Sequence, residues 1–205
     1  ALGVDVKLTV DDIRKSFVQT AQSGNTSAAV ELLGEAKYQM LDALTETGNV
    51  SFLAIGRPEG AGCYCKVNAY LKEIISMIAD NFDYIVIDGE AGIEQVNRRV
   101  MEKVTHLILV SDASRKGLQV IKTIHTVARE MVMFEKSGVI INRLPAEIPA
   151  EPLDTGGLEL LCCIPDERTV TVNDMKGESV YNLPDESAVI KGVKEALRQL
   201  NISGA

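Results

Sequence analysis

The chain of 205 residues contains no tryptophan, and only 4% of its residues are aromatic. Hydrophobic residues nevertheless make up 46% of the chain, which is ordinary for a globular protein and enough for a sizeable core. That core must therefore be built mainly from aliphatic side chains. The length favours one domain, and we expect residues 1–205 to form a single one.

The sequence also lacks an excess of positive charge. Its 21 Lys and Arg residues are outnumbered by 29 Asp and Glu residues, which gives a net charge of −8. Nucleic-acid binding needs a cationic face, so nucleic acid is not expected as a partner. No apolar run approaches the length of a membrane span, so no membrane partner is expected either. Four cysteines, without the composition of a disulfide scaffold, indicate a reducing cytoplasm.

Apolar segments of two kinds alternate along the chain. Short continuous apolar runs predict buried strands, whereas longer segments with apolar residues at helical spacing predict amphipathic helices. Strands are expected at 52–55, 84–88, 106–110, 139–142 and 158–164. Helices are expected at 27–45, 66–79, 93–103 and 114–134, with a first helix that starts at Thr9 and a last one capped by Asp185. A polar loop is expected at 17–25. This alternation predicts an α/β fold with a mostly parallel sheet and helices on both faces.

Polar and turn-forming residues gather where these predicted strands end. They are Arg57, Asp88, Ser111, Asp112, Asn142, Arg143, Pro165 and Asp166. In parallel α/β sheets, ligands bind at the carboxyl ends of the strands. The clustering of these residues is therefore the main argument from sequence for a binding site.

Two of these strand ends carry residue patterns with a chemical interpretation. Asp88 and Gly92 form an Asp-x-x-x-Gly pattern, and phosphoryl-transfer folds use such a carboxylate to hold hydrated Mg²⁺ and such a glycine near the γ-phosphate. An ordinary strand-to-helix turn uses the same residue types, and the motif alone does not separate the two interpretations. Asn142 can both donate to and accept from adenine, but in isolation a turn-forming Asn is the more common explanation.

Cys63 and Cys65 follow a glycine-rich turn that begins at Gly56 and precedes a predicted helix. Amides at a helix N-terminus favour thiolates, so both cysteines are candidate metal or redox ligands. Two thiolates are half of a tetrahedral site, which a symmetric dimer would complete, and two idle thiols are the alternative. Cys162 and Cys163 are neighbours in a predicted strand and face opposite ways, so we expect core residues rather than a chelating pair.

Taken together, these segments resemble a known family. Gly56 to Cys65, with its Gly-x-Gly-Cys-x-Cys spacing, looks like the Cys-x-Cys segment of the CooC-type ATPases. These are nickel-insertion accessory proteins of carbon monoxide dehydrogenase, in the MinD-like branch of the P-loop NTPases. Asp88 to Glu94 is similar to the family's Walker B and switch region, Ile141 to Arg143 to a later strand end, and Ile164 to Glu167 to the loop near adenine.

The resemblance implies an ATP-dependent maturation factor that helps insert nickel into carbon monoxide dehydrogenase. It also implies a cytoplasmic homodimer that closes around ATP and reopens on hydrolysis to ADP. In that dimer, Cys63 and Cys65 of both protomers would share one Ni²⁺ or Zn²⁺ ion.

The resemblance assigns roles at the nucleotide as well. Asp88 would hold Mg²⁺ through water, and Gly92 would sense the γ-phosphate. Asn142 would contact adenine with Arg143 beside it, and the Pro165-Asp166 loop would adjoin the base.

The family's phosphate-binding loop, Gly-Lys-Gly-Gly-x-Gly-Lys-Thr, does not occur among these residues. In the family, that loop, its helix and a second strand precede a stretch similar to Ala1–Val4. We therefore expect an N-terminally incomplete P-loop NTPase fold that lacks the first strand, the loop and the second strand. The resemblance implies ATPase activity for the intact protein, and whether this chain itself hydrolyses ATP stays open.

Three alternatives stay open beside the CooC-type function. One is a MinD- or ParA-like positioning ATPase, which the acidic balance disfavours. Another is a non-catalytic Cys-x-Cys metal-binding module, which the missing phosphate loop favours. The third is a role like that of the nitrogenase iron protein, whose dimers also share a metal centre through cysteines.

Overall fold

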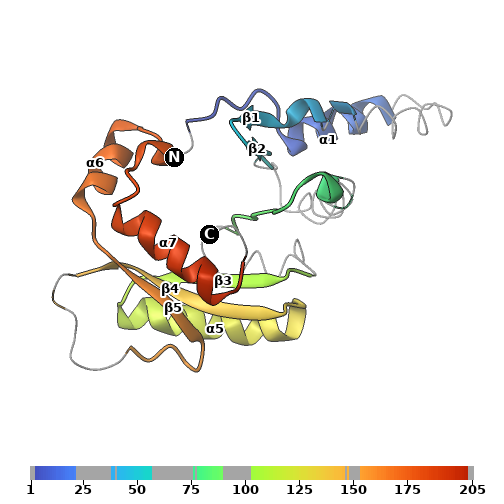
Figure 1. Ribbon diagram of the computed structural model, residues 1–205. Coiled ribbons are helices and arrows are strands. Elements are labelled where there is room, and N and C mark those ends of the chain that lie inside the picture. Colours follow the sequence, from blue (N-terminus) through green and yellow to red (C-terminus); the bar gives the residue numbers. More distant parts are fainter. Residues whose placement is uncertain are drawn as a thin grey trace. The chain divides into compact units, whose positions relative to one another are not determined.

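The computed structural model of the chain describes residues 3–21, 38–39, 41–56, 76, 78–89, 103–145, 147 and 153–202. The chain divides into two compact units (Figure 1). The larger consists of residues 1–3 and 89–205, and the smaller of residues 4–88.

The larger unit is built on a parallel sheet with the strand order β3-β4-β5. The strands are β3 (His106–Ser111), β4 (Lys136–Leu144) and β5 (Glu159–Pro165). In this register His106 lies opposite Lys136, and Gly138 lies opposite Glu159. The strands predicted at 106–110, 139–142 and 158–164 are therefore present, and the first two extend further than predicted.

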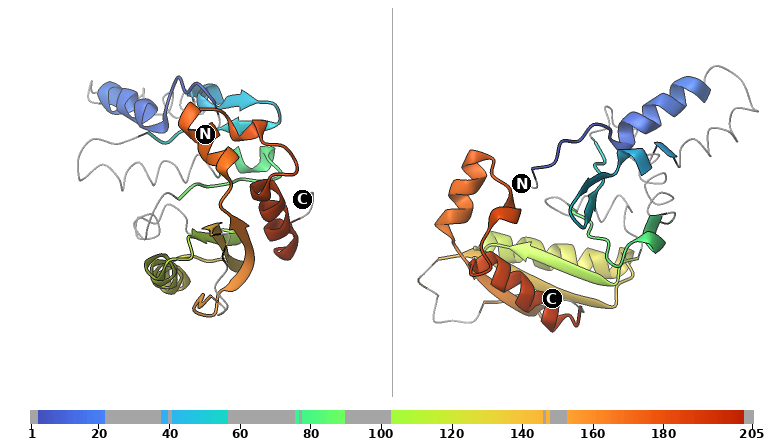
Figure 2. Two further views of the ribbon diagram at one scale, coloured as in Figure 1. Left: turned by 90° about the vertical axis from the view of Figure 1, so that its left-hand side faces the viewer. Right: turned by 45° about the horizontal axis from the view of Figure 1, so that its top comes forward.

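In the described part of the larger unit, helices cover both faces of this sheet (Figures 1 and 2). Helix α5 (Arg115–Met131) packs on one face around a core that includes Leu107, Ile121 and Ile141. Helix α7 (Ala188–Gln199) packs on the other face around Leu161 and Ala196. The predicted α/β fold, with a parallel sheet between helices, is confirmed. Its core is aliphatic, as the scarcity of aromatic residues requires.

The turn between β3 and α5 uses a strand-end carboxylate as a structural cap. Asp112 Oδ1 accepts a hydrogen bond from the Ser114 amide at 3.0 Å, and Ser114 Oγ accepts from the Gly117 amide at 3.0 Å. The bonds from the Ser114 side chain and amide hold the pKa of Asp112 below its usual value. Asp112 therefore has a local role in starting α5.

The N-cap residue of α7 lies two residues after the predicted one. Ser187, not Asp185, is the N-cap residue, and its hydroxyl accepts from the Val189 amide at 3.2 Å. Asp185 instead pairs with Lys194 at 3.2 Å. Before α7, the structure adds two elements that the sequence did not predict, α6 (Arg168–Lys176) and the 3-10 turn η2 (Val180–Asn182).

In the smaller unit, helix α1 (Val10–Ala21) begins where predicted, with Thr9 Oγ1 accepting from the Asp12 amide at 3.2 Å. The helix continues to residue 21, so the polar loop predicted from residue 17 is wrong in its first part. Once a helix has started, each further residue adds a backbone hydrogen bond, so extension is easier than initiation. The amide of Val10 donates to Ala54 O at 3.0 Å, which ties the helix to the extended segment 53–56.

The predicted strand at 52–55 is replaced by a short antiparallel hairpin of β1 (Thr45–Thr47) and β2 (Val50–Phe52). Gly48 stands at its turn with φ of 60°, a conformation that glycine adopts readily. The helix predicted at 27–45 therefore ends before β1.

The strand predicted at 84–88 is wrong for the described part of the chain. Residues 84–89 follow the 3-10 turn η1 (Ala79–Asn81) and form no strand there, and Val86 is 93% exposed. The apolar run marks the segment as suitable for a sheet, but only a hydrogen-bonded neighbour makes it a strand. The helix predicted at 93–103 and nearly all of the helix predicted at 66–79 lie outside the described residues.

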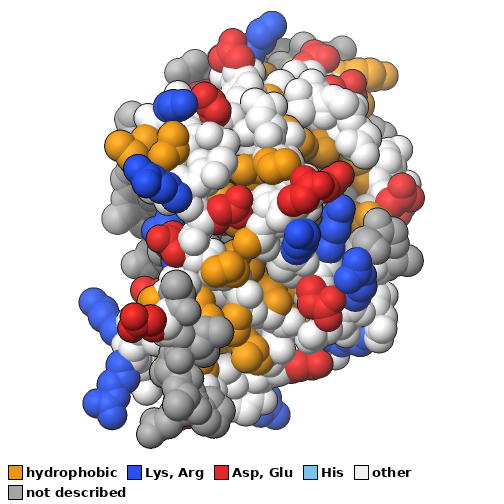
Figure 3. Space-filling view, turned by 60° about the vertical axis from the view of Figure 1, so that its left-hand side comes forward, with side chains coloured by type: hydrophobic (Ala, Val, Ile, Leu, Met, Phe, Trp, Pro, Cys, Tyr) orange, Lys and Arg blue, Asp and Glu red, His pale blue; other side chains and the backbone are white. Residues whose placement is uncertain are grey.

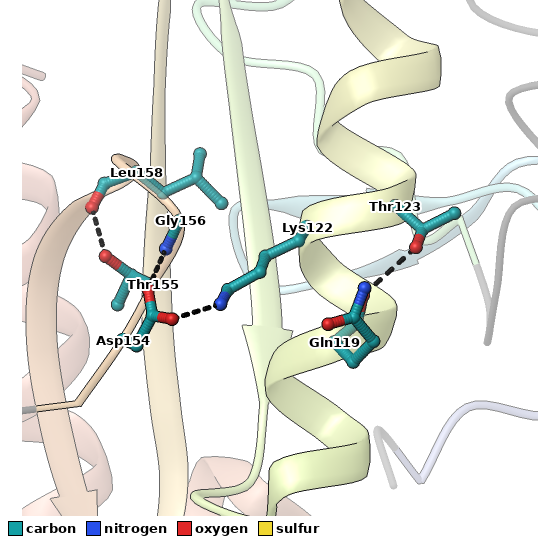
Figure 4. A network of polar contacts seen from close by, with 7 residues as sticks. All are labelled: Gln119, Lys122, Thr123, Asp154, Thr155, Gly156 and Leu158. Carbon is teal, nitrogen blue, oxygen red and sulfur yellow. Dashed lines mark hydrogen bonds and ion pairs between the residues drawn. The ribbon is translucent and has the colours of Figure 1, made fainter.

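The loop that leads into β5 is tied to α5 by the network drawn in Figure 4. Lys122 Nζ forms an ion pair with Asp154 Oδ2, and Asp154 Oδ1 accepts from the Gly156 amide at 3.0 Å. Gly156 has φ of 67°, and a Cβ there would lie 2.7 Å from Lys122 Cγ. The lysine stem therefore covers a glycine that no larger residue could replace without strain.

This ion pair predicts a pH-dependent contribution to stability. The hydrogen bond from Lys122 holds the pKa of Asp154 below the usual 3.8, with the Gly156 amide and the Lys122 charge adding to it. Since the native state favours the ionised carboxyl, the stabilisation is present above pH 3.8 and is lost as the pH falls through the lower native pKa. We expect Asp154→Asn to lower the urea midpoint at pH 7 and to lower it less at pH 3. An equal loss at both pH values would contradict this assignment.

Candidate functional site

A cavity of about 540 Å³ lies at the carboxyl ends of β4 and β5. Ligand pockets commonly measure about 300–1,000 Å³. Asn142, Arg143, Pro165 and Asp166, the four residues predicted to lie at the nucleotide, all line it. The remaining lining residues are Glu167, Val170, Thr171, Asn173, Asp174, Glu178, Val180, Leu183 and Val189. The structure brings the four predicted residues together, and their contact with a nucleotide stays a prediction.

The end of β4 departs from regular strand geometry at the pocket. Its pairing with β5 is irregular between Ile141 and Leu144, and Arg143 has φ of 54°. Asn142 Oδ1 accepts a hydrogen bond from the Arg143 amide at 2.9 Å. Bulges of this kind redirect side chains beside binding sites. Because the Asn142 carbonyl oxygen is engaged locally, its NH₂ group is the part best suited to meet a ligand as a donor.

The end of β5 is held by backbone and side-chain hydrogen bonds. The Asp166 amide donates to Leu144 O at 3.0 Å and extends the pairing of the two strands past Pro165. Glu167 follows, and its carboxylate accepts from the Ser187 hydroxyl at 2.7 Å. The two strand ends that form the pocket are thus fixed to each other, and the second is fixed to the start of α7.

The chemistry of the pocket walls is apolar and acidic. Val170, Val180, Leu183 and Val189 supply aliphatic surface, which suits a flat ring. Carboxylates come from Asp166, Glu167, Asp174 and Glu178, and Arg143 is the cation among the lining residues. Coulomb repulsion disfavours a polyanion beside such a set. The pocket therefore suits an uncharged group with hydrogen-bonding edges better than a phosphate chain.

Charge is mixed over the surface that Figure 3 draws, where Lys and Arg side chains lie among Asp and Glu side chains. Separate cationic patches are the usual sign of nucleic-acid binding. The absence of a nucleic-acid partner remains a prediction. No described helix is both long enough and apolar enough to cross a membrane.

Several of the predicted site residues lie outside the described part of the chain. Cys63, Cys65, Arg57 and Gly92 are among them. Asp88 is described, and it has an exposed side chain at the end of the extended segment 84–89. Within the described ranges, no group of three or more His, Cys, Asp or Glu side chains is arranged to hold a metal.

The adjacent cysteines of β5 behave differently from each other. Cys162 packs against the core beneath α7, as predicted. Its burial raises the pKa of the thiol, and the neighbouring Cys163 and Glu195 raise it further. Cys163 is exposed, so the prediction of a core residue is wrong there. It lies on the edge strand of the described sheet, and no β5 residue belongs to the core beneath α5.

The sequence placed Glu167 in the loop near adenine but did not predict its bonds to the start of α7, nor the pocket wall formed by α6 and η2. Helix α6 has no buried residues, so its sequence carries no apolar periodicity by which to find it. The sequence of α7 gives a weak indication of such a contact, because its first turn contains no acidic residue of its own. Helix N-termini favour a nearby carboxylate, which here comes from outside the helix.

The left-handed conformation of Arg143 predicts a gain in stability on substitution. A non-glycine residue in this region costs about 1–2 kcal/mol, so Arg143→Gly is expected to raise the free energy of unfolding by about 1 kcal/mol. Asn201 is a matched control with φ of 58°, away from the pocket. Asn201→Gly should gain less, because Asn tolerates this conformation better than Arg. Urea unfolding measures both, and a loss of stability in Arg143→Gly would contradict the assignment of strain.

The fold and the position of this pocket define the class of protein. A parallel sheet between helices, with a pocket at the carboxyl ends of its strands, is an α/β fold of the P-loop NTPase type. No family model matches the chain.

Comparison with curated proteins identifies the family. The chain is 35% identical to an uncharacterized ATP-binding protein, MJ0685, of Methanocaldococcus jannaschii over 204 residues, which cover 97% of this chain and 80% of that protein. A second such protein of this organism, MJ0823, is 28% identical over 69% of this chain and 57% of its own length. The chain belongs to the family of ATP-binding proteins that includes MJ0685.

A more distant similarity links the chain to a protein named as an accessory protein. The carbon monoxide dehydrogenase accessory protein CooC of Rhodospirillum rubrum is 29% identical over 132 residues. The aligned region covers 60% of this chain and 48% of CooC.

Proposed function

We propose that this protein binds ATP with the base in the pocket at the ends of β4 and β5, and that it acts as a nucleotide-dependent accessory protein. The observation that carries the proposal is the convergence of Asn142, Arg143, Pro165 and Asp166 on one cavity. Membership of a family of ATP-binding proteins supports it. Similarity to the carbon monoxide dehydrogenase accessory protein CooC supports a role beside that enzyme. The Cys-x-Cys segment extends the proposal to nickel insertion, which would take place in the cytoplasm.

The walls of the pocket explain which part of the nucleotide it takes. Aliphatic side chains such as Val170 and Val189 pack against the ring, and the Asn142 NH₂ group donates to a ring nitrogen. The Asp166 carboxylate accepts from an exocyclic amine. The phosphates lie outside the acidic pocket. Asp88 would hold Mg²⁺ through water, because a carboxylate is a ligand that Mg²⁺ prefers, and Gly92 would sense the γ-phosphate.

Metal delivery in this proposal depends on a homodimer. Cys63 and Cys65 of two protomers together provide four thiolates for one Ni²⁺ ion as cargo, and Zn²⁺ suits the same ligands. ATP binding closes the dimer, and hydrolysis reopens it and releases the metal to the client enzyme. The Cys-x-Cys motif is the feature of the chain that supports this part of the proposal.

The nucleotide proposal is tested by calorimetric titration of the full-length protein with ATP, adenosine and tripolyphosphate. Loss of one hydrogen bond to the base in Asn142→Ala should weaken ATP and adenosine by about tenfold. Tripolyphosphate should bind this variant and the wild type alike. Asn81→Ala, in the smaller unit, is the control and should bind all three as the wild type does. Equal adenosine affinity in Asn142→Ala and wild type would exclude Asn142 from the base site.

The metal proposal is tested by metal content per dimer after reconstitution with Ni²⁺ or Zn²⁺. The wild type should hold one ion per dimer, and the Cys63→Ser/Cys65→Ser variant should lose it, because Ser oxygen is a poor ligand for these ions. Cys163→Ser is the matched control, since Cys163 is exposed and should leave the stoichiometry unchanged. An unchanged stoichiometry in the double variant would rule out the shared thiolate site.

A further inference from the structure

The segment from Glu167 to Ser187 forms most of the pocket wall, yet it has little packing of its own. It leaves the end of β5, forms α6 and η2, and returns at the start of α7. Helix α6 contains no buried residues, and neither does η2. Because α6 and η2 contain no buried residues, polar contacts contribute much of what holds this wall, among them the contacts at its two ends.

Both ends of the segment meet at one carboxylate. Glu167 Oε2 accepts hydrogen bonds from the Ser187 hydroxyl at 2.7 Å, the Ala188 amide at 2.9 Å and the Val189 amide at 3.4 Å. Ser187 is 3% exposed, so these bonds lie away from solvent. Glu167 is also the N-cap residue of α6, but its side chain makes no bond to that helix. The carboxylate is directed entirely to the start of α7.

Helix α7 is a rigid partner for this carboxylate. A Cβ at Gly192 would lie 2.6 Å from Ile164 Cγ1, so the helix lies close against β5. At its other end, Lys136 Nζ donates to Leu200 O at 2.8 Å. Each end of α7 therefore has a side chain of the charge that its backbone dipole favours, Glu167 at the N-terminus and Lys136 at the C-terminus.

We propose that Glu167 is the positioning residue of the nucleotide pocket. By joining the two ends of the wall at the N-terminus of α7, it holds α6 and η2 in the place where they close over the base. Glu167 itself need not touch the ligand. This inference rests on the proposed function, because it concerns the same pocket.

Variants of the two ends of α7 test this inference. Glu167→Gln replaces a charged acceptor of three hydrogen bonds by a neutral amide and removes the negative charge at the N-terminus of α7, and it should weaken ATP and adenosine by about tenfold. Ser187→Ala removes one of the three bonds, so its effect should be smaller, and it serves if Glu167→Gln does not fold. Lys136→Met is the matched control, because it removes the charged bond at the far end of α7 and should leave both affinities unchanged.

Two readouts separate positioning from general loss of stability. Tripolyphosphate affinity should be the same in all variants, because the wall meets only the base. Hydrogen exchange of the amides in 168–176 should speed up in Glu167→Gln and not in Lys136→Met. Unchanged ATP affinity in Glu167→Gln would overturn the inference whatever the exchange rate, and so would an equal loss of affinity in Lys136→Met.

The same experiment distinguishes failure of the inference from failure of the proposed function. If the wild-type protein binds neither ATP nor adenosine, the proposed function is wrong, and an inference about a nucleotide pocket is overturned with it. If the wild type binds both ligands and Glu167→Gln binds them equally well, only the positioning role is overturned.

Discussion

The parallel pairing of β4 with both of its neighbours is the constraint on which the larger unit depends. Parallel strands need crossover connections, and here helices cover both faces of the sheet. Because all three strands point the same way, their carboxyl ends lie at one edge. The chain must turn away from the sheet at each of these ends, so irregular backbone and polar side chains collect there. The position of the pocket is thus a consequence of strand direction.

The pocket forms where regular pairing of β4 with β5 stops. At that point Arg143 takes a left-handed conformation, and Asn142 bonds to the backbone beside it. The Glu167 carboxylate holds the opposite wall at the start of α7, and α6 contains no buried residues. Acidic residues around the cavity then favour the base end of a nucleotide over its phosphates. A pocket suited to the base of a nucleotide agrees with the membership of this chain in a family of ATP-binding proteins.

The parts of the fold that could be predicted are those marked by residues close together in the sequence. Strands β3, β4 and β5 are continuous apolar runs, and the strand-end rule grouped Asn142 with Asp166 without any knowledge of contacts. The sequence could not predict α6, which has no buried residues, or the bond of Glu167 to Ser187, which is twenty residues away. It also misjudged residues 84–88, because an apolar run does not specify a pairing neighbour. The prediction that Cys163 is buried was also wrong. The sequence does not show that β5 lies at the edge of the described sheet.

The central claim is that the base of a nucleotide binds at the carboxyl ends of β4 and β5. Photolabelling with 8-azido-ATP tests it most directly, because the reactive group is on the base itself. After proteolysis and mass spectrometry, the account predicts label in peptides that contain residues 142–143 or 165–189, and predicts that excess adenosine removes it. Protectable label confined to peptides outside these segments would contradict the account.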